Sequence, residues 1–348
     1  MGFAQWGGDW GGSSWGGGGG WGGEYGAIEK GADHEISGYA SLGYSSLNYS
    51  PTGSTTSGGS FGFGVGAGYT YNFTGEWALL TGVEGNYFSG STQFSKLVSI
   101  SRELYEGASG KTIAEGGDEV YYILGNLDTY SEDQWAMYLH IPIMGQYSFQ
   151  VPVLGADWYK NFFVAAGVKV GFSLASSYSA AAKTLTTSGV FPYTNFKPED
   201  LPNHNFGQYS NPTMPSGDLS FGLDVSAAIE FGLKIPLGDD GTKNLFAGIF
   251  FNYGLLNVAP AAEEKGLVSL GSTPATGGDT PFTYGSILTS QQYATTNYEP
   301  NKLSAFTPYV DKVNLMSVGV KLRFAFGLQS SERSYYWYSN ILVFSFFF

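Results

Sequence analysis

The 348-residue sequence contains no cysteine, only three histidines and only 13% charged residues. The lack of cysteine excludes disulfides, thiolate metal sites and a cysteine nucleophile, and it fits an oxidising or envelope compartment. No window of ~18 apolar residues occurs, so a transmembrane helix is excluded. This criterion does not detect membrane-spanning strands, because only half of their residues are apolar. The net charge of −13 argues against nucleic-acid binding, which needs a basic surface.

Glycine and aromatic residues are abundant instead, with 52 Gly, 25 Tyr and 26 Phe. The stretch SFGFGVGAGYTYNFT at 60–74 places Phe, Val, Ala or Tyr at each odd position and Gly, Ser, Thr or Asn at each even one. Alternation with a period of two predicts a strand. One face of this strand is long and apolar, and the opposite face carries almost no bulk.

Similar alternation recurs in eight segments, which predicts an all-β protein. The segments are 35–48, 60–74, 77–88, 135–148, 161–175, 218–236, 244–257 and 312–327. Short turns alternate with longer links at 49–59, 89–134, 176–217 and 258–311. Such alternation is typical of a transmembrane antiparallel up-and-down β-barrel with short periplasmic turns and long extracellular loops. We expect eight strands; ten is the alternative, since 119–125 (EVYYILG) is a further strand candidate.

The chain divides into three parts. Residues 1–33 form a Gly/Trp-rich segment, interpreted as a flexible linker, and residues 1–4 resemble the end of a secretory signal. Residues 34–327 form the barrel. Residues 328–348 form an aromatic tail that is either an additional strand or an appendage. Whether the N-terminal segment threads the lumen stays open at this point.

Charged side chains and one histidine fall on the strand face opposite the apolar one. They are Glu84, His140, Lys169, Asp224, Glu230, Lys234, Lys321 and Arg323. Inside a closed barrel these groups would have to pair, because a lone buried charge is costly. We therefore predict a lumen filled by ion pairs, with His140 as a pairing member rather than a metal ligand. The weaker alternative uses Glu84, Asp224 and Glu230 as paired general acids. No cofactor is indicated.

Aromatic residues gather at the predicted strand ends. Trp77, Trp135, Trp158 and Tyr147 occupy such positions. Membrane barrels place Trp and Tyr in girdles at both interfaces, so we interpret these four as interface residues. Ordinary β-propensity explains how frequent aromatics are, but it accounts less well for where they lie.

The run YLHIPIMGQY (138–147), with GFGVGAGYTYNFT before it and VAAGVKVGFSL after it, resembles the outer-membrane β-barrel domain common in Bacteroidota. That porin-family domain is similar to the OmpA and OmpX membrane barrels; His140 stands where it usually has an acid. The resemblance covers about 35–327. It implies a barrel in the bacterial outer membrane and carries no catalytic residues.

The C-terminal residues Phe344, Phe346 and Phe348 alternate, and they resemble the terminal signal that the barrel-assembly machinery recognises. The resemblance thus implies outer-membrane lipid, lipopolysaccharide and that machinery as partners, with other envelope proteins as further candidates.

Three functions remain after this reading. The first is a non-enzymatic barrel acting as structural anchor, surface-binding protein or subunit of an envelope complex. The second is a small-solute pore, and the third a membrane-embedded hydrolase, for which His34 and His204 give little support. The link 89–134 is acidic, which suits either a solvated loop or one that binds divalent cations or a basic partner. Its acids are Glu103, Glu106, Glu115, Asp118, Glu119, Asp128, Glu132 and Asp133, against Lys96, Arg102 and Lys111.

Overall fold

The computed structural model describes residues 32–49, 51, 54, 56–105, 119–152, 159–190, 206–214, 216–238, 242–263, 265–270, 282–293 and 306–328. Every regular element in these ranges is a β-strand. Among the residues described, no helix has the length and apolar character needed to span a membrane.

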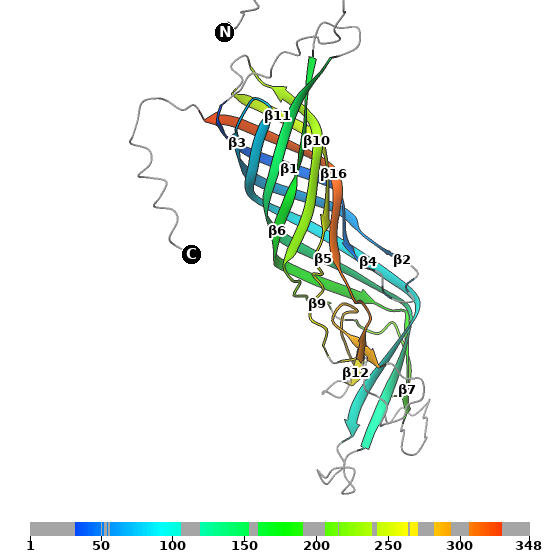
Figure 1. Cartoon of the computed structure of the whole chain (residues 1–348). Helices are drawn as coiled ribbons and strands as arrows, with labels where there is room; N and C mark the ends of the chain where they lie inside the picture. Colours follow the sequence, from blue (N-terminus) through cyan, green and yellow to red (C-terminus); the bar gives the residue numbers. More distant parts are fainter. Residues whose placement is uncertain are drawn as a thin grey trace, which may run out of the picture.

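Eight strands close into a ring, as the sequence predicts. They are β1 (His34–Asn48), β3 (Ser60–Asn72), β4 (Trp77–Tyr105), β5 (Glu119–Pro152), β6 (Tyr159–Ala181), β10 (Asp224–Pro236), β11 (Lys243–Gly254) and β16 (Asn314–Leu328). The order is β4-β3-β1-β16-β11-β10-β6-β5, and β5 pairs back onto β4. All these pairs are antiparallel, and Figure 1 shows the strands steeply tilted around the ring. The eight-stranded barrel is confirmed.

The two ends of the barrel differ. The strand pairs β3–β4, β5–β6 and β10–β11 are joined by short connections at residues 73–76, 153–158 and 237–242, and we call this the turn end. The longer connections leave the opposite end, which we call the loop end. Strand β1 begins and strand β16 ends at the turn end, where His34 lies opposite Leu328.

The barrel wall has its apolar side outward and its charged side inward. On β6, Val168 is 41% exposed while its neighbour Lys169 is 3% exposed. On β10, Phe231 is 44% exposed while Glu230 is 4% exposed. A water-soluble sheet would have the reverse arrangement. A closed ring leaves no unpaired backbone edge, so this outer surface suits hydrocarbon.

The hairpin of β4 and β5 continues beyond the loop end, with its pairing running out to Tyr105 opposite Glu119. Figure 1 shows it projecting past the barrel, with β7 (Thr184–Val190) beside it. β8 (Gly207–Ser210) pairs with β7, β2 (Thr56–Gly58) with β4, and β9 (Ser216–Asp218) with β6. We call β7, β8 and the projecting parts of β4 and β5 the extension.

The expectation of long loops is therefore wrong for the described parts of 89–134 and 176–217, which lie largely in strands. The stretch 119–125 is part of β5 rather than a tenth ring strand. These segments stay in strands because the extension buries one face, through side chains such as Phe94, Leu127 and Leu185.

The connection between β11 and β16 folds back over the loop end. It contains β12 (Val268–Leu270) paired with β13 (Phe282–Tyr284), and β14 (Gln291–Tyr293) paired with β15 (Phe306–Pro308). We call the described residues of 258–313 the cap; Figure 1 shows β12 just past the barrel, next to the hairpin.

An apolar core unites the cap, the extension and the loop end of the barrel. Its fully or nearly fully buried members include Leu47, Phe88, Phe94, Leu97, Ile123, Leu127, Tyr138, Leu185, Leu267, Val268, Ile287, Leu288 and Leu315. Leu219 and Phe221 also belong to it. The expected strand 218–236 begins instead at Asp224, because the residues before it turn inward to this core rather than outward to lipid.

A strained residue marks the point where the hairpin leaves the barrel. Thr129 has a φ of 53°, which a β-branched residue rarely adopts. Around it, the buried positions of β5 change from odd (Ile123, Leu127) to even (Tyr130, Glu132). The irregularity therefore reverses which face of the strand points inward.

Candidate functional site: the lumen and the capped end

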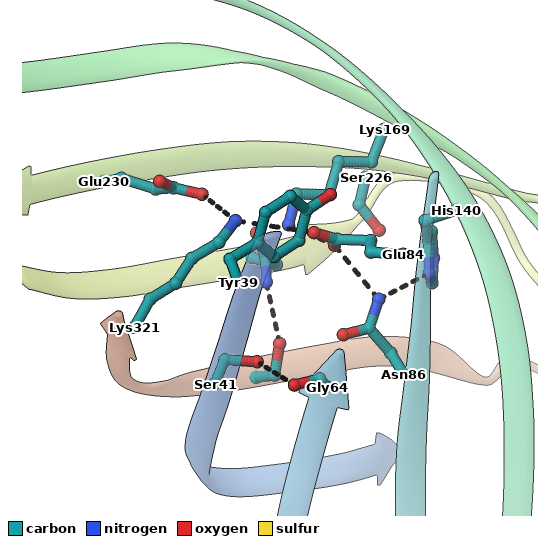
Figure 2. A network of polar contacts seen from close by, with 12 residues as sticks. Tyr39, Ser41, Gly64, Glu84, Asn86, His140, Lys169, Ser226, Glu230 and Lys321 are labelled. Carbon is teal, nitrogen blue, oxygen red and sulfur yellow. Dashed lines mark hydrogen bonds and ion pairs between the residues drawn. The ribbon is translucent and has the colours of Figure 1, made fainter. Parts of the chain in front are cut away.

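The centre of the lumen is a chain of ion pairs around Glu84 on β4. One carboxylate oxygen lies 2.5 Å from Lys169 Nζ and the other 3.4 Å from Lys321 Nζ. Lys321 also lies 2.6 Å from Glu230 Oε1. Figure 2 shows these side chains converging from different strands. Each member is nearly dry, so each charge relies on its partners for stabilisation.

A second branch of the network runs through His140 (Figure 2). Asn86 Nδ2 lies 3.0 Å from Glu84 Oε1 and 3.0 Å from His140 Nδ1. An amide nitrogen can only donate, so Nδ1 accepts and Nε2 carries the proton. Nε2 lies 3.1 Å from Asp224 Oδ2, and the hydroxyl of Ser226 donates to the same carboxylate. Through Asn86, the imidazole links the Asp224 carboxylate to that of Glu84.

A third group of charges lies towards the turn end. Arg323 donates to Gln146 Oε1, and its guanidinium carbon lies 3.9 Å from the centre of the Phe246 ring. Lys234 Nζ lies 5.8 Å from the same ring centre. Glu35 is buried and interacts electrostatically with both cations.

Among the described residues, the formal charges of the lumen balance. Its four carboxylates are Glu35, Glu84, Asp224 and Glu230, and its four fixed cations are Lys169, Lys234, Lys321 and Arg323. Two cavities described within it have volumes of about 10 and 20 Å³, the space of roughly one water molecule. Side chains therefore fill the described lumen.

All eight residues that the sequence predicts for the lumen face inward, but the sequence reading missed several that complete the network. These are Glu35, Tyr39, Asn86 and Gln146. Lys321 Nζ lies 4.2 Å from the centre of the Tyr39 ring. A Cβ at Gly66 would lie 2.5 Å from that ring, so glycine is needed there. The parity of β1, β4 and β5 was the available signal, because these residues share the inward face of their strands.

The predicted interface aromatics lie at two levels of the wall. At the turn end the rings of Trp77 and Tyr147 are 4.8 Å apart, and at the loop end those of Tyr87 and Trp135 are 6.1 Å apart. The ten residue-to-residue steps of β4 from Trp77 to Tyr87 span ~33 Å, or ~25 Å across the membrane at a tilt of ~40°. That height matches the apolar band of a membrane barrel. Trp158 lies outside the described residues.

Beyond the loop end, Glu132 on β5 is a buried carboxylate with four donors. Oε1 accepts from Gln134 Nε2 at 2.8 Å and from Ser286 Oγ at 2.5 Å. Oε2 accepts from the Ile287 backbone N–H at 3.0 Å and from the Tyr130 hydroxyl. Burial raises the pKa of Glu132 above its ordinary value of 4.5, although these hydrogen bonds oppose the rise. The expectation of a wholly solvated acidic loop is thus wrong at this residue.

The remaining predicted residues are placed only in part. His34 lies at the turn end with Nδ1 2.6 Å from the Tyr69 hydroxyl. His204, most of residues 1–33, and Phe344, Phe346 and Phe348 lie outside the described residues. Within the described ranges, no group of three or more His, Asp or Glu side chains is arranged to hold a metal ion.

A closed antiparallel barrel with charges sealed inside and an apolar band outside defines an outer-membrane type of β-barrel. The chain matches the family described as outer membrane protein beta-barrel domain over residues 30–259, and it belongs to that family. Its location is therefore the bacterial outer membrane. No curated protein matches it. The matched region ends near the start of the cap, before β16 completes the ring.

Proposed function

We propose that this protein is a non-enzymatic, closed barrel that anchors the extension and the cap at the membrane surface. It would act there as a structural anchor, a surface-binding protein or a subunit of a larger envelope complex. The observation that carries the proposal is the self-neutralising lumen, in which Glu84, Lys169, Lys321 and Glu230 satisfy one another.

A pore for small solutes is the alternative, and the packing of the lumen argues against it. A permeating ion would have to replace ion pairs as close as 2.5 and 2.6 Å within a nearly dry interior, where breaking a pair costs ~3–5 kcal/mol. It would also have to pass the apolar core at the loop end, which contains Leu47, Phe88 and Leu315. Both features favour a barrel that does not conduct.

A hydrolase would need an accessible nucleophile beside a base. His140 is 2% exposed and its Nε2 faces Asp224. Ser226 donates to that same carboxylate instead of to the imidazole. This arrangement supports the non-enzymatic proposal, because the hydroxyl and the base are not paired.

The extension supports a role in binding. It presents an ordered sheet, β4-β5-β7-β8, beyond the aromatic girdle that contains Trp135. With the loop end facing outward, this sheet would meet lipopolysaccharide and neighbouring envelope proteins. We retain the barrel-assembly machinery as the partner during insertion.

Planar-bilayer recording tests the closed lumen. We expect the purified protein to give no discrete conductance steps, while protection of the barrel from added protease shows independently that it has inserted. A triple variant, Glu84→Ala with Lys169→Ala and Lys321→Ala, hollows the lumen and serves as the comparison. Reproducible steps from the unmodified protein would overturn the closed barrel and favour the pore.

A cross-linking experiment tests the binding role. The chain has no cysteine, so Lys96→Cys places a unique thiol on the exposed part of the extension. We expect a discrete cross-linked band with an envelope component in whole cells, and none from Lys243→Cys at the turn end. Equal patterns from the two positions would count against a binding surface at the loop end.

A further inference from the structure

The Glu132 carboxylate is the feature outside the lumen that the proposed function leaves unexplained. It is 0% exposed, it lies among apolar side chains, and its hydrogen-bond partners include no cation among the described residues. Each of its oxygens meets one nitrogen that can only donate, Gln134 Nε2 on one side and Ile287 N on the other. Such a site is built for a carboxyl group, since an amide would present its own donors to one of them.

The four donors are divided between two parts of the protein. Tyr130 and Gln134 belong to the same strand, β5, as Glu132 itself, whereas Ser286 and Ile287 belong to the cap. The cap end of this contact is itself ordered, because Ser286 Oγ also accepts from the Leu288 backbone N–H at 3.1 Å. Glu132 therefore joins the wall to the cap.

Two further polar contacts between the described parts of the cap and the hairpin are neutral. The Val268 N–H donates to Ser99 Oγ at 2.9 Å, and the Tyr309 hydroxyl donates to the Val98 carbonyl at 3.0 Å. Apolar packing of Leu267, Val268 and Ile287 adds to these contacts. Removing Glu132 would leave buried donors on both sides without an acceptor, which costs more than losing an exposed hydrogen bond.

We propose that Glu132 is a latch that holds the cap closed over the loop end of the barrel, so that losing its hydrogen bonds releases the cap while the barrel stays folded. The latch goes beyond the proposed function, because it holds whether or not the lumen conducts.

Thiol labelling tests the latch in the full-length protein in lipid vesicles. Val268 is 0% exposed in the cap core, so Val268→Cys reports release of the cap. Ala228 is 5% exposed on the inner face of β10, so Ala228→Cys reports opening of the barrel. Each reporter is combined with Glu132→Ala, or with Asp133→Ala as the matched control, since Asp133 is the adjacent exposed acid on β5.

We expect Glu132→Ala to accelerate labelling at the Val268→Cys reporter by about tenfold or more, because buried donors lose their acceptor. The rate at the Ala228→Cys reporter should not change, and Asp133→Ala should change neither. Unchanged labelling at the cap reporter would overturn the latch. Equal acceleration at both reporters would also overturn it, since Glu132 would then support the whole fold.

A milder variant covers the case in which Glu132→Ala does not assemble. Ser286→Ala removes one donor from the cap side and leaves β5 intact. We expect at least about threefold faster labelling at the cap reporter, because the hydrogen bond to Glu132 and the one from the Leu288 N–H are both lost, with Thr289→Ala in the same turn as control. No difference between these two variants would overturn the latch.

Discussion

The barrel and the cap bury opposite kinds of side chain. In the barrel, Lys169 and Glu230 are buried while Val320 and Phe231 face outward. In the cap and the adjoining parts of β4 and β5, Leu127 and Ile287 are buried while the charged Lys96 and Asp133 are exposed. The boundary between the two arrangements lies just beyond the girdle that contains Trp135. The same alternating pattern therefore occurs in lipid and in water, and the medium around the sheet decides which face is buried.

The largest effect is expected from breaking the ion-pair centre of the barrel. Lys169→Met leaves Glu84 with only the longer of its two ion pairs, Lys321 at 3.4 Å, so we expect a loss of ~3 kcal/mol or more in the free energy of unfolding. Urea unfolding in lipid vesicles measures it. Lys243→Met, at an exposed position of the barrel wall, should cost less than ~0.5 kcal/mol. Similar losses for both would show that the lumen is hydrated.

A cation placed outward sharpens the contrast between the regions. Val320 is 56% exposed on β16 and Val98 is 40% exposed on the extension. Val320→Arg should cost ~2–4 kcal/mol in a bilayer because it puts a charge into hydrocarbon. Val98→Arg should stay within ~0.5 kcal/mol because water reaches it. Comparing unfolding in vesicles measures both, and a costly Val98→Arg would place the membrane boundary further out.

Much of the barrel could be predicted from the sequence, because period-two alternation is a local property. The eight ring strands and the inward placement of Glu84, His140 and Arg323 follow from parity alone. The pairs could not be predicted in detail. Which cation meets Glu84 depends on the stagger between β4, β6 and β16, which are far apart in the chain.

The cap and the extension could not be predicted from the sequence, for a different reason. Leu219 and Phe221 continue the alternation of β10, yet they turn into the cap core. Glu132 looks like one more acid in an acidic stretch. Its burial depends on Ser286 and Ile287, over 150 residues further on. Thr129 reverses the parity of β5 without any glycine or proline to signal it.

A change of pH should act on the cap through Glu132. Burial raises the pKa of Glu132 above 4.5 in the closed cap. Between 4.5 and that raised pKa, the closed form binds a proton that the released form lacks. Cap closure therefore weakens as pH rises through this window, and it is constant below pH 4.5. Burial also raises the pKa of Tyr130, so that hydroxyl stays protonated throughout.

The Val268→Cys reporter measures this dependence when its rate is divided by that of the denatured chain at the same pH. Other titratable groups near the contact between Glu132 and the cap are Tyr49, Asp133, Tyr178 and Glu263. With Ser286→Ala the pH dependence should extend to higher pH, since the lost hydrogen bond lowers the pKa of Glu132 and so opposes the effect of burial. A flat profile for the unmodified protein would show that Glu132 keeps one protonation state in both forms.

The smallest effect is expected where the hairpin leaves the barrel. Thr129 is exposed and has a φ of 53°, a conformation that asparagine tolerates better than a β-branched residue does. Thr129→Asn should therefore stabilise the extension by ~0.5–1 kcal/mol, whereas Thr129→Val, which keeps the branched Cβ, should not. Hydrogen exchange of amides 122–128 measures it, with those of 138–146 as the internal reference. If both groups of amides slowed together, the extension and the barrel would open as one cooperative unit, and the two regions would differ in composition but not in folding.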